Sequence, residues 1–142
     1  MIVTLLPIGA AATQLGVAPS TLRYYEQRGL LAPAERRAGQ RMYGQPELRR
    51  LAFLHLAGQL GIPLAVAGAV LDEPAQAWRE TVTDQIAQLQ DLIERARGAQ
   101  QFLTHALECP TEHPTTQCST LTRSLDHLIT GATVEELAAD QS

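Results

Sequence analysis

Five arginines and three tyrosines are concentrated in the first third of this sequence, in stretches around positions 23 and 41. Guanidinium groups and phenolic hydroxyls donate hydrogen bonds to phosphate oxygens and base edges, so such stretches have the chemistry of a nucleic-acid contact. All eleven basic residues of the chain are arginines. The candidate contacts are Arg23, Tyr24, Arg28, Arg36, Arg37, Arg41 and Tyr43.

The only two cysteines of the chain supply a second kind of chemistry. Cys109 and Cys118 are separated by eight residues that form a polar, proline-containing loop. In a reducing compartment such a pair favours free thiols or metal ligands over a structural disulfide, although the two could also close into a disulfide as an oxidation switch. Cys109 follows the negative end of a predicted helix, so we expect its pKa to be raised. Cys118 begins a helix and should ionise more readily.

Two short helices are expected to position the first arginines. Residues 8–15 form one helix and residues 19–28 the other, with a glycine turn between them. Leu22 and Tyr25 lie three residues apart and face a core together, which turns Arg23 to a different side. Two helices joined in this way form a helix-turn-helix, whose second helix reads the nucleic acid.

Residues 35–43 do not show a helical pattern. They contain three arginines around a glycine, and the alternating residues Arg41-Met42-Tyr43 at their end indicate a strand that leaves a turn. A basic hairpin beside a reading helix is a wing, which lies along the sugar–phosphate backbone. The alternative is a solvated loop with incidental arginines. Residues 2–6 are predicted to form a short extended segment.

Two further helices, at residues 46–60 and 64–71, are expected to complete this head. The first has a broad apolar face, and Arg49 and Arg50 lie off that face. His55 is interpreted as a core or boundary histidine. The apolar face comprises Leu48, Leu51, Phe53, Leu54, Leu56 and Leu60.

The longest helical pattern covers residues 75–108. Its apolar residues recur mostly at spacings of three and four, which predicts a coiled-coil seam roughly 50 Å long. A single helix of this length cannot bury its seam against so small a head, so we expect a homodimer that carries two heads to two half-sites. A short amphipathic helix and a capping box at residues 133–136 follow the cysteines. The seam comprises Trp78, Val82, Ile86, Leu89, Ile93, Ala96, Leu103 and Leu107, with Gln100 as its weak position.

Charge is divided unevenly along the chain. The net charge of −4 taken alone argues against a nucleic-acid partner. Residues 1–71, however, carry seven arginines and three acidic residues, whereas residues 72–142 carry four arginines and twelve acidic residues. A basic head on an acidic remainder is typical of a DNA-binding protein with a separate partner arm, and chance asymmetry is the alternative.

Other classes of protein have less support. No apolar run approaches the ~20 residues that span a bilayer, and the opening residues are too few and lack the basic residue of a signal peptide, so we expect a cytoplasmic protein without a membrane partner. An enzyme is not expected, because no nucleophile has a spaced base and no glycine-rich phosphate loop or carboxylate pair occurs. A coiled-coil interaction module without effector sensing is the more serious rival, but it leaves the reading helix and the wing unexplained.

Four segments together resemble the MerR family of bacterial transcription regulators, and the resemblance covers residues 8–108 in order. The Arg-Tyr-Tyr-Glu stretch followed by Gly-Leu-Leu is its most specific part. The resemblance implies a mainly α fold with a winged helix-turn-helix head, a long antiparallel coiled-coil dimerisation helix, and a short C-terminal effector loop and helix. The segments are residues 8–17, 21–31, 39–43 and 60–64.

The resemblance also implies a function. Dimers of this family bind an overlong spacer in double-stranded promoter DNA, and they bend and untwist it when an effector is bound, which realigns the promoter elements for RNA polymerase. Arg23 resembles the family's reading-helix contact, Tyr24 a backbone contact, and Arg41 and Tyr43 the wing contacts.

Two positions depart from the family pattern. Gln40 replaces the usual wing tyrosine, and Ala18 replaces the usual helix cap. Neither change removes an arginine, so DNA binding is still expected. We predict a DNA-binding head at residues 1–72, a dimerisation helix at residues 73–108 and an effector region at residues 109–142.

The cysteine loop resembles the metal loop of the family's metal-sensing branch in position and spacing. The resemblance implies Cys109 and Cys118 as ligands, with His113 and then His105 as added nitrogen ligands. No third cysteine lies near the start of the long helix, so two thiolates favour a soft monovalent ion, Cu(I) or Ag(I), over Zn(II) or Hg(II). Thiol redox sensing and an organic effector are the alternatives, and the 34 residues after Glu108 are too few for the drug-binding domain of the multidrug branch.

Overall fold

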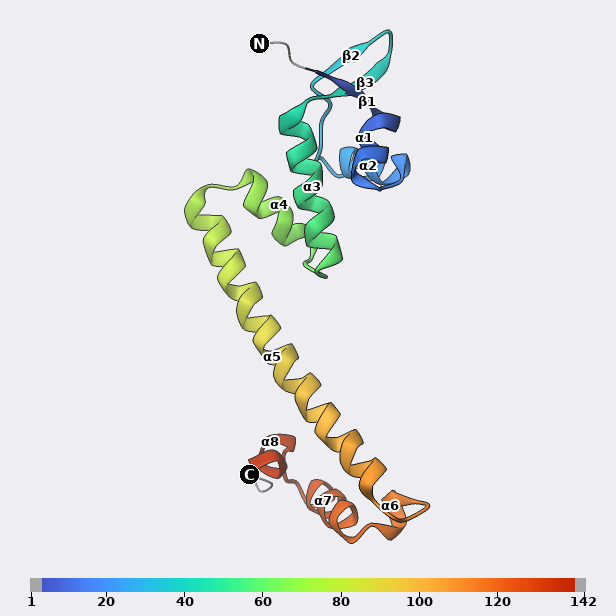
Figure 1. Cartoon of the computed structure of the whole chain (residues 1–142). Helices are drawn as coiled ribbons and strands as arrows, with labels where there is room; N and C mark the ends of the chain where they lie inside the picture. Colours follow the sequence, from blue (N-terminus) through green and yellow to red (C-terminus); the bar gives the residue numbers. More distant parts are fainter. Residues whose placement is uncertain (1–3, 140–142) are drawn as a thin grey trace. The chain divides into compact units, whose positions relative to one another are not determined.

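The computed structural model describes residues 4–139, which are mostly helical with one small antiparallel sheet (Figure 1). The chain divides into two compact units, residues 1–85 and residues 86–142. None of the helices among the described residues is long and apolar enough to cross a membrane. The elements are β1 (Leu6–Pro7), α1 (Ile8–Leu15), α2 (Pro19–Gln27), β2 (Glu35–Arg37), β3 (Gln40–Tyr43), α3 (Gln45–Gln59), α4 (Leu64–Asp72), α5 (Ala75–Glu108), α6 (Pro114–Gln117), α7 (Ser119–Ile129) and α8 (Val134–Ala139).

The helix-turn-helix is made by α1 and α2, close to the predicted bounds. Gly16 ends α1 in the left-handed conformation, with φ of 67°, which a glycine adopts without steric cost. Pro19 occupies the first turn of α2, where its missing N–H is not needed. Ala18 precedes it and makes no side-chain cap hydrogen bond, as its lack of a polar side chain predicts.

The predicted hairpin is present as β2 and β3, and β1 joins its other edge, so the strand order is β1-β3-β2. Its two turn residues, Ala38 and Gly39, have φ of 49° and 78°. Positive φ at both positions gives a turn whose twist matches that of the flanking strands. Leu6 pairs with Tyr43, so the extended segment predicted at residues 2–6 is represented by its last residue, and residues 2 and 3 lie outside the described part.

The core of the first unit is formed where α1, α2, α3 and β3 meet. On α3 the buried residues Leu51, Leu54 and Ala57 recur every three positions, and each fully buried leucine contributes about 1.5–3 kcal/mol. The predicted apolar face of this helix was too broad, because Leu56 and Leu60 are 55% and 65% exposed. The buried cluster comprises Ala11, Ala12, Leu22, Tyr25, Leu31, Tyr43, Leu51, Leu54, Ala57 and Ala67.

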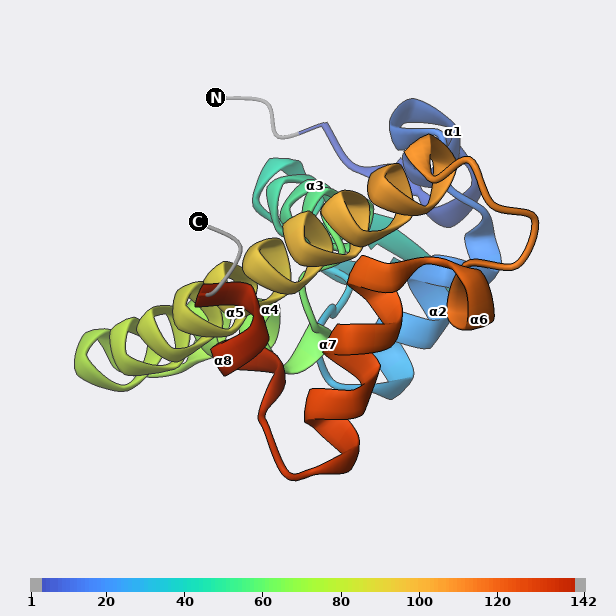
Figure 2. The ribbon, with the colours of Figure 1, turned by 90° about the horizontal axis from the view of Figure 1, so that it is seen from below.

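The second unit contains the greater part of α5 and the short helices that follow it (Figure 2). With 34 residues, α5 has the predicted bounds, and it contains no buried residue. A short helix, α6, occupies part of the predicted polar loop. The capping box at the start of α8 is present, since the Thr133 N–H donates to Glu136 Oε2 at 2.8 Å and the Glu136 N–H donates to Thr133 Oγ1 at 3.2 Å.

Candidate nucleic-acid interface

The exposed side of α2 presents the first three candidate contacts. Leu22 and Tyr25 are buried and anchor the helix, while Arg23, Tyr24 and Arg28 are exposed. The guanidinium carbon of Arg28 lies 5.6 Å from the centre of the Tyr24 ring, within cation–π range. The helix therefore combines two guanidinium groups and a phenol on one accessible surface, which is the chemistry that phosphates and base edges require.

The wing adds exposed guanidinium groups from β2. Arg36 and Arg37 are both exposed, and they point to opposite faces because successive strand residues alternate. Arg36 lies directly opposite Arg41, so these two side chains share one face of the hairpin. The Nε–H of Arg37 donates to the carboxylate of Glu35 on the same strand.

The two remaining wing candidates are both held by Glu26 of α2. The Arg41 Nε lies 2.6 Å from Glu26 Oε2, and the Tyr43 hydroxyl donates to the other carboxylate oxygen. Arg41 keeps 33% of its side chain exposed, whereas Tyr43 is fully buried. Burial and then the Glu26 carboxylate raise the pKa of the Tyr43 hydroxyl above its usual range. This placement counts against the predicted DNA contact at Tyr43, which has no exposed surface.

The role of Glu26 was missed by sequence reasoning. A carboxylate is repelled by DNA phosphates, so a search for DNA contacts passes over it. Its partners lie 15 and 17 positions further along the chain, on a strand rather than a neighbouring turn of the same helix. No local spacing rule connects them, and the tertiary structure alone brings them together.

Arg50 forms a second connection within the first unit. Its Nε–H donates to the Leu30 carbonyl just beyond α2, and its Nη2 lies 2.5 Å from the carboxylate of Asp72 at the end of α4. The neighbouring Arg49 is exposed. Arg50 thus ties the end of the reading helix to the segment that leads into α5.

The two cysteines of the second unit make separate contacts. Cys118 is buried, and its Sγ lies 3.9 Å from the Nε2 of His105 on α5. The Cys109 Sγ lies 3.1 Å from the hydroxyl of Thr111. Hydrogen bonds from Thr111, with a smaller one from Cys118, lower the pKa of the Cys109 thiol. The expected increase in this pKa is therefore wrong, because the hydrogen bonds with Thr111 favour the thiolate.

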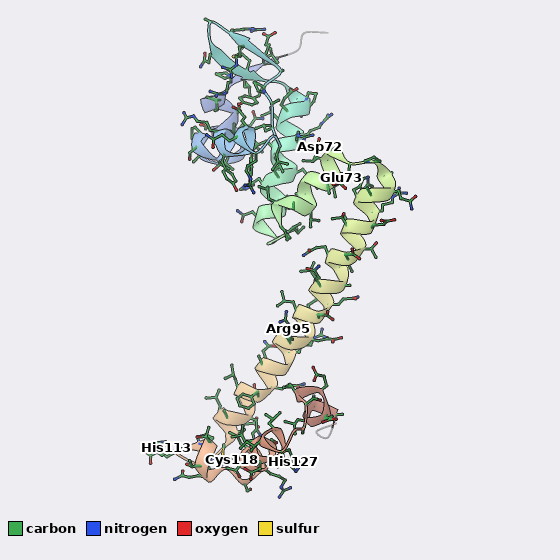
Figure 3. All side chains as sticks on the ribbon, turned by 180° about the vertical axis from the view of Figure 1, so that it is seen from behind. Asp72, Glu73, Arg95, His113, Cys118 and His127 are labelled. Carbon is green, nitrogen blue, oxygen red and sulfur yellow. The ribbon has the colours of Figure 1, made fainter. Side chains whose placement is uncertain are left out.

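His113 is not brought to the thiols. Its side chain is exposed, and in Figure 3 it lies at the edge of the second unit, apart from Cys118. Among residues 4–139 no group of three or more histidine, cysteine or acidic side chains is arranged to hold a metal ion. The two sulfur atoms, and the His105 Nε2 that lies 3.9 Å from the Cys118 Sγ, are donors of the type that a soft ion of low coordination number prefers.

Comparison with known proteins identifies relatives of this arrangement. Residues 6–73 match the family model described as "MerR HTH family regulatory protein". A "probable heavy metal-dependent transcriptional regulator" of Haemophilus influenzae is 33% identical over 102 residues, which are 62% of this chain and 80% of that protein. The chain spans only 27% of the activator TipA of Streptomyces coelicolor and 50% of a ZntR homolog of Haemophilus influenzae.

Solved structures show the same fold. The transcription regulator PbrR691 from Ralstonia metallidurans CH34, in complex with lead(II), has a TM-score of 0.61 at 22% identity and covers 83% of this chain and 98% of its own. HiNmlR, a MerR family regulator lacking the sensor domain and bound to promoter DNA, has a TM-score of 0.55 at 21% identity, over 74% of this chain and 89% of its own. The named relatives are transcription regulators, which confirms the expectation that the chain is not an enzyme.

Proposed function

The chain belongs to the MerR family of transcription regulators, and from this premise we propose that it binds double-stranded promoter DNA as a homodimer and distorts the promoter spacer in response to an effector. The exposed surface of α2 carries the proposal, because Arg23 and Tyr24 project from a helix that a buried face holds in place. Arg28, Arg36 and Arg37 serve the sugar–phosphate backbone.

Dimerisation through α5 supplies the second head. The helix leaves large apolar side chains exposed over its length, which a second copy of α5 would cover in an antiparallel coiled coil. Two heads on one dimer engage two half-sites, and the bend that both require deforms the spacer between them for RNA polymerase. The exposed apolar residues are Ile86, Leu92, Ile93, Phe102, Leu103 and Leu107.

The effector that we propose is a soft metal ion at Cys109 and Cys118. Cu(I) or Ag(I) suits two thiolates better than Zn(II) or Hg(II), and His105 takes the place predicted for His113 as the nearest nitrogen. The names of the Haemophilus influenzae relative and of PbrR691 refer to heavy metal and lead(II), which supports a metal-sensing branch. A bound ion would supply positive charge that draws both thiolates to itself.

Thiol oxidation is the second candidate effector, because Cys109 and Cys118 are both free thiols and Cys118 contributes to lowering the pKa of Cys109. In this reaction the two sulfur atoms form one bond, and two protons and two electrons pass to an oxidant such as peroxide.

DNA binding is tested by selecting duplexes from a random pool with the full chain and then measuring anisotropy against the selected and scrambled sequences. We expect an inverted repeat with two half-sites, and an affinity that falls steeply with salt. Selection of no preferred sequence would remove the proposal.

The effector is tested by competition titration of the reduced protein with Cu(I), Ag(I), Zn(II) and Hg(II). We expect the monovalent ions to bind most tightly and Cys109→Ser or Cys118→Ser to abolish binding, with His113→Ala as the control that retains it. Tighter binding of Zn(II) than of the monovalent ions, with a requirement for His113, would indicate a mixed cysteine–histidine site instead. No ion binding, together with a reversible disulfide under mild peroxide, would favour the redox alternative.

A further inference from the structure

Glu26 is an acidic side chain within the surface that we propose to bind DNA, although DNA is itself negatively charged. It lies on α2, and only 12% of its side chain is exposed. Its two carboxylate oxygens are used separately, one beside the Arg41 guanidinium and the other accepting from the Tyr43 hydroxyl. Both partners belong to β3, so the carboxylate joins the reading helix to the wing.

The other acidic residue of the wing makes a contact of a different kind. Glu35 accepts a hydrogen bond from Arg37, two residues away on the same strand, and both side chains are largely exposed. Such a pair connects no two elements, and solvent screens it. Glu26 and Glu35 therefore place equal charge near wing arginines, but only Glu26 crosses from one DNA-contacting element to the other.

We infer that Glu26 is a positioning residue for DNA recognition, whose carboxylate fixes the wing against the reading helix so that both elements meet the duplex in one register. The inference rests on the proposed DNA-binding function. Arg41 is held by one carboxylate oxygen with a third of its side chain exposed, so its guanidinium is aimed before DNA arrives. Tyr43 acts from inside the core as the second point of attachment. Fixing both points lowers the conformational entropy that binding must otherwise remove.

Removal of the Glu26 carboxylate has two effects on DNA binding that act in opposite directions, one through its charge and one through its connection of α2 to β3. Loss of a negative charge beside DNA strengthens binding to every sequence equally, because phosphate attraction carries no sequence information. Loss of the connection between α2 and β3 weakens binding only where both elements must fit together, which is at the operator. The ratio of operator affinity to random-duplex affinity therefore separates the two effects.

The experiment compares Glu26→Ala and Glu26→Gln with Glu35→Ala in the full chain, against a selected operator and a random duplex at two salt concentrations. For Glu26→Ala we expect the operator-to-random ratio to fall about tenfold, with random-duplex affinity unchanged or higher. Glu26→Gln retains an oxygen acceptor for Tyr43 and should restore part of the ratio. Glu35→Ala should raise both affinities and leave the ratio unchanged.

A double-mutant cycle adds a measurement that general destabilisation does not mimic. The effects of Arg23→Ala and Arg41→Ala on operator affinity should be coupled with Glu26 present and additive in the Glu26→Gln background. If Glu26→Ala fails to fold, this folded glutamine variant carries the test.

Two outcomes overturn the inference: an unchanged ratio in the Glu26 variants, or additivity already present in the unaltered protein. Failure of the unaltered protein to prefer any operator would instead remove the proposed function itself.

Discussion

The two units of this chain differ in where their apolar side chains lie. In the first unit α1, α2 and α3 each bury at least two residues in a shared core, to which α4 adds Ala67. In the second unit Cys118 is the only buried residue among those that the structure describes. The first unit thus satisfies its own hydrophobic pattern, whereas the second leaves large apolar residues in solvent.

This difference indicates where each unit obtains its stability. A self-contained core makes the geometry of the reading helix independent of protein concentration, while an uncovered helix face depends on a second copy. The arrangement suits a regulator whose DNA contacts are fixed and whose response depends on the relation between two copies.

The largest effect is expected from a charge in the proposed dimer seam. Leu89→Glu places a carboxylate, and its copy in the partner, on the face that we propose to be buried. Dimer formation should weaken by about 3–5 kcal/mol, because an unpaired charge loses its hydration. Analytical ultracentrifugation should show monomers that bind the operator poorly. Gln90→Glu, at the exposed neighbouring position, is the control and should leave dimer formation unchanged. A stable monomer of the unaltered protein would contradict the proposal that the second unit is stabilised by a second copy.

A cavity in the first unit should act differently from one in the second. Leu54 is fully buried, so Leu54→Ala should lower the free energy of unfolding by about 2–5 kcal/mol at any protein concentration. Leu103 is 62% exposed, and Leu103→Ala should change stability only through the dimer, so its effect should be largest at high protein concentration and should vanish when dilution leaves both proteins monomeric. Thermal unfolding at several concentrations measures both. Equal, concentration-independent losses would show that the units do not differ as described.

Loss of a single base contact should leave both units folded. Arg23→Ala is expected to weaken the free energy of operator binding by about 1–3 kcal/mol per half-site and to relax sequence preference, because alanine cannot make the bidentate contact of a guanidinium group with a base. Arg123→Ala, an exposed arginine on α7, is the matched control and should not alter operator preference. Anisotropy titration against the operator and single-base variants measures the effect. Unchanged preference after Arg23→Ala would exclude α2 as the reader.

The Arg50 connection should make a smaller contribution. Arg50 and Asp72 are 27% and 49% exposed, so solvent screens their attraction, and Asp72→Asn should cost no more than about 1 kcal/mol of stability. Arg50→Ala should cost somewhat more, because the Leu30 carbonyl also loses its donor. Urea unfolding distinguishes the two variants. Equal losses would mean that the bond to Leu30 adds nothing.

The smallest expected effect is a dependence of stability on pH in the alkaline range. The folded-state pKa of Tyr43 is raised by burial and by Glu26, so the folded state favours the protonated hydroxyl. Its contribution is fully present below about pH 10, the usual tyrosine pKa, and is lost as the pH rises through the folded-state value. Tyr43→Phe should flatten this slope in unfolding measured above pH 9. An unaltered slope would mean that another group causes it.

Local rules were enough to predict most of the helices and turns, although α6 lies in a segment predicted to be a loop. Proline at the first turn of α2, glycine after α1 and the Thr133–Glu136 capping box each act within a few residues, so their effects can be read along the chain. The bounds of α5 follow from uninterrupted helical periodicity between two prolines. The basic character of the candidate interface is likewise a property of residue types and their order.

Contacts between distant segments were decided by tertiary structure. The burial of Tyr43 and the attachment of Arg41 to Glu26 depend on how α2 packs against β3 in the first unit. The contact between His105 and Cys118 depends on how the chain after α5 folds back in the second unit. The pKa of Cys109 follows the same principle, since it is lowered by hydrogen bonds with Thr111 that the position of Cys109 at a helix end does not predict. Periodicity specifies which face of an element is apolar, but a hydrogen bond depends on atomic positions that only the packed chain defines.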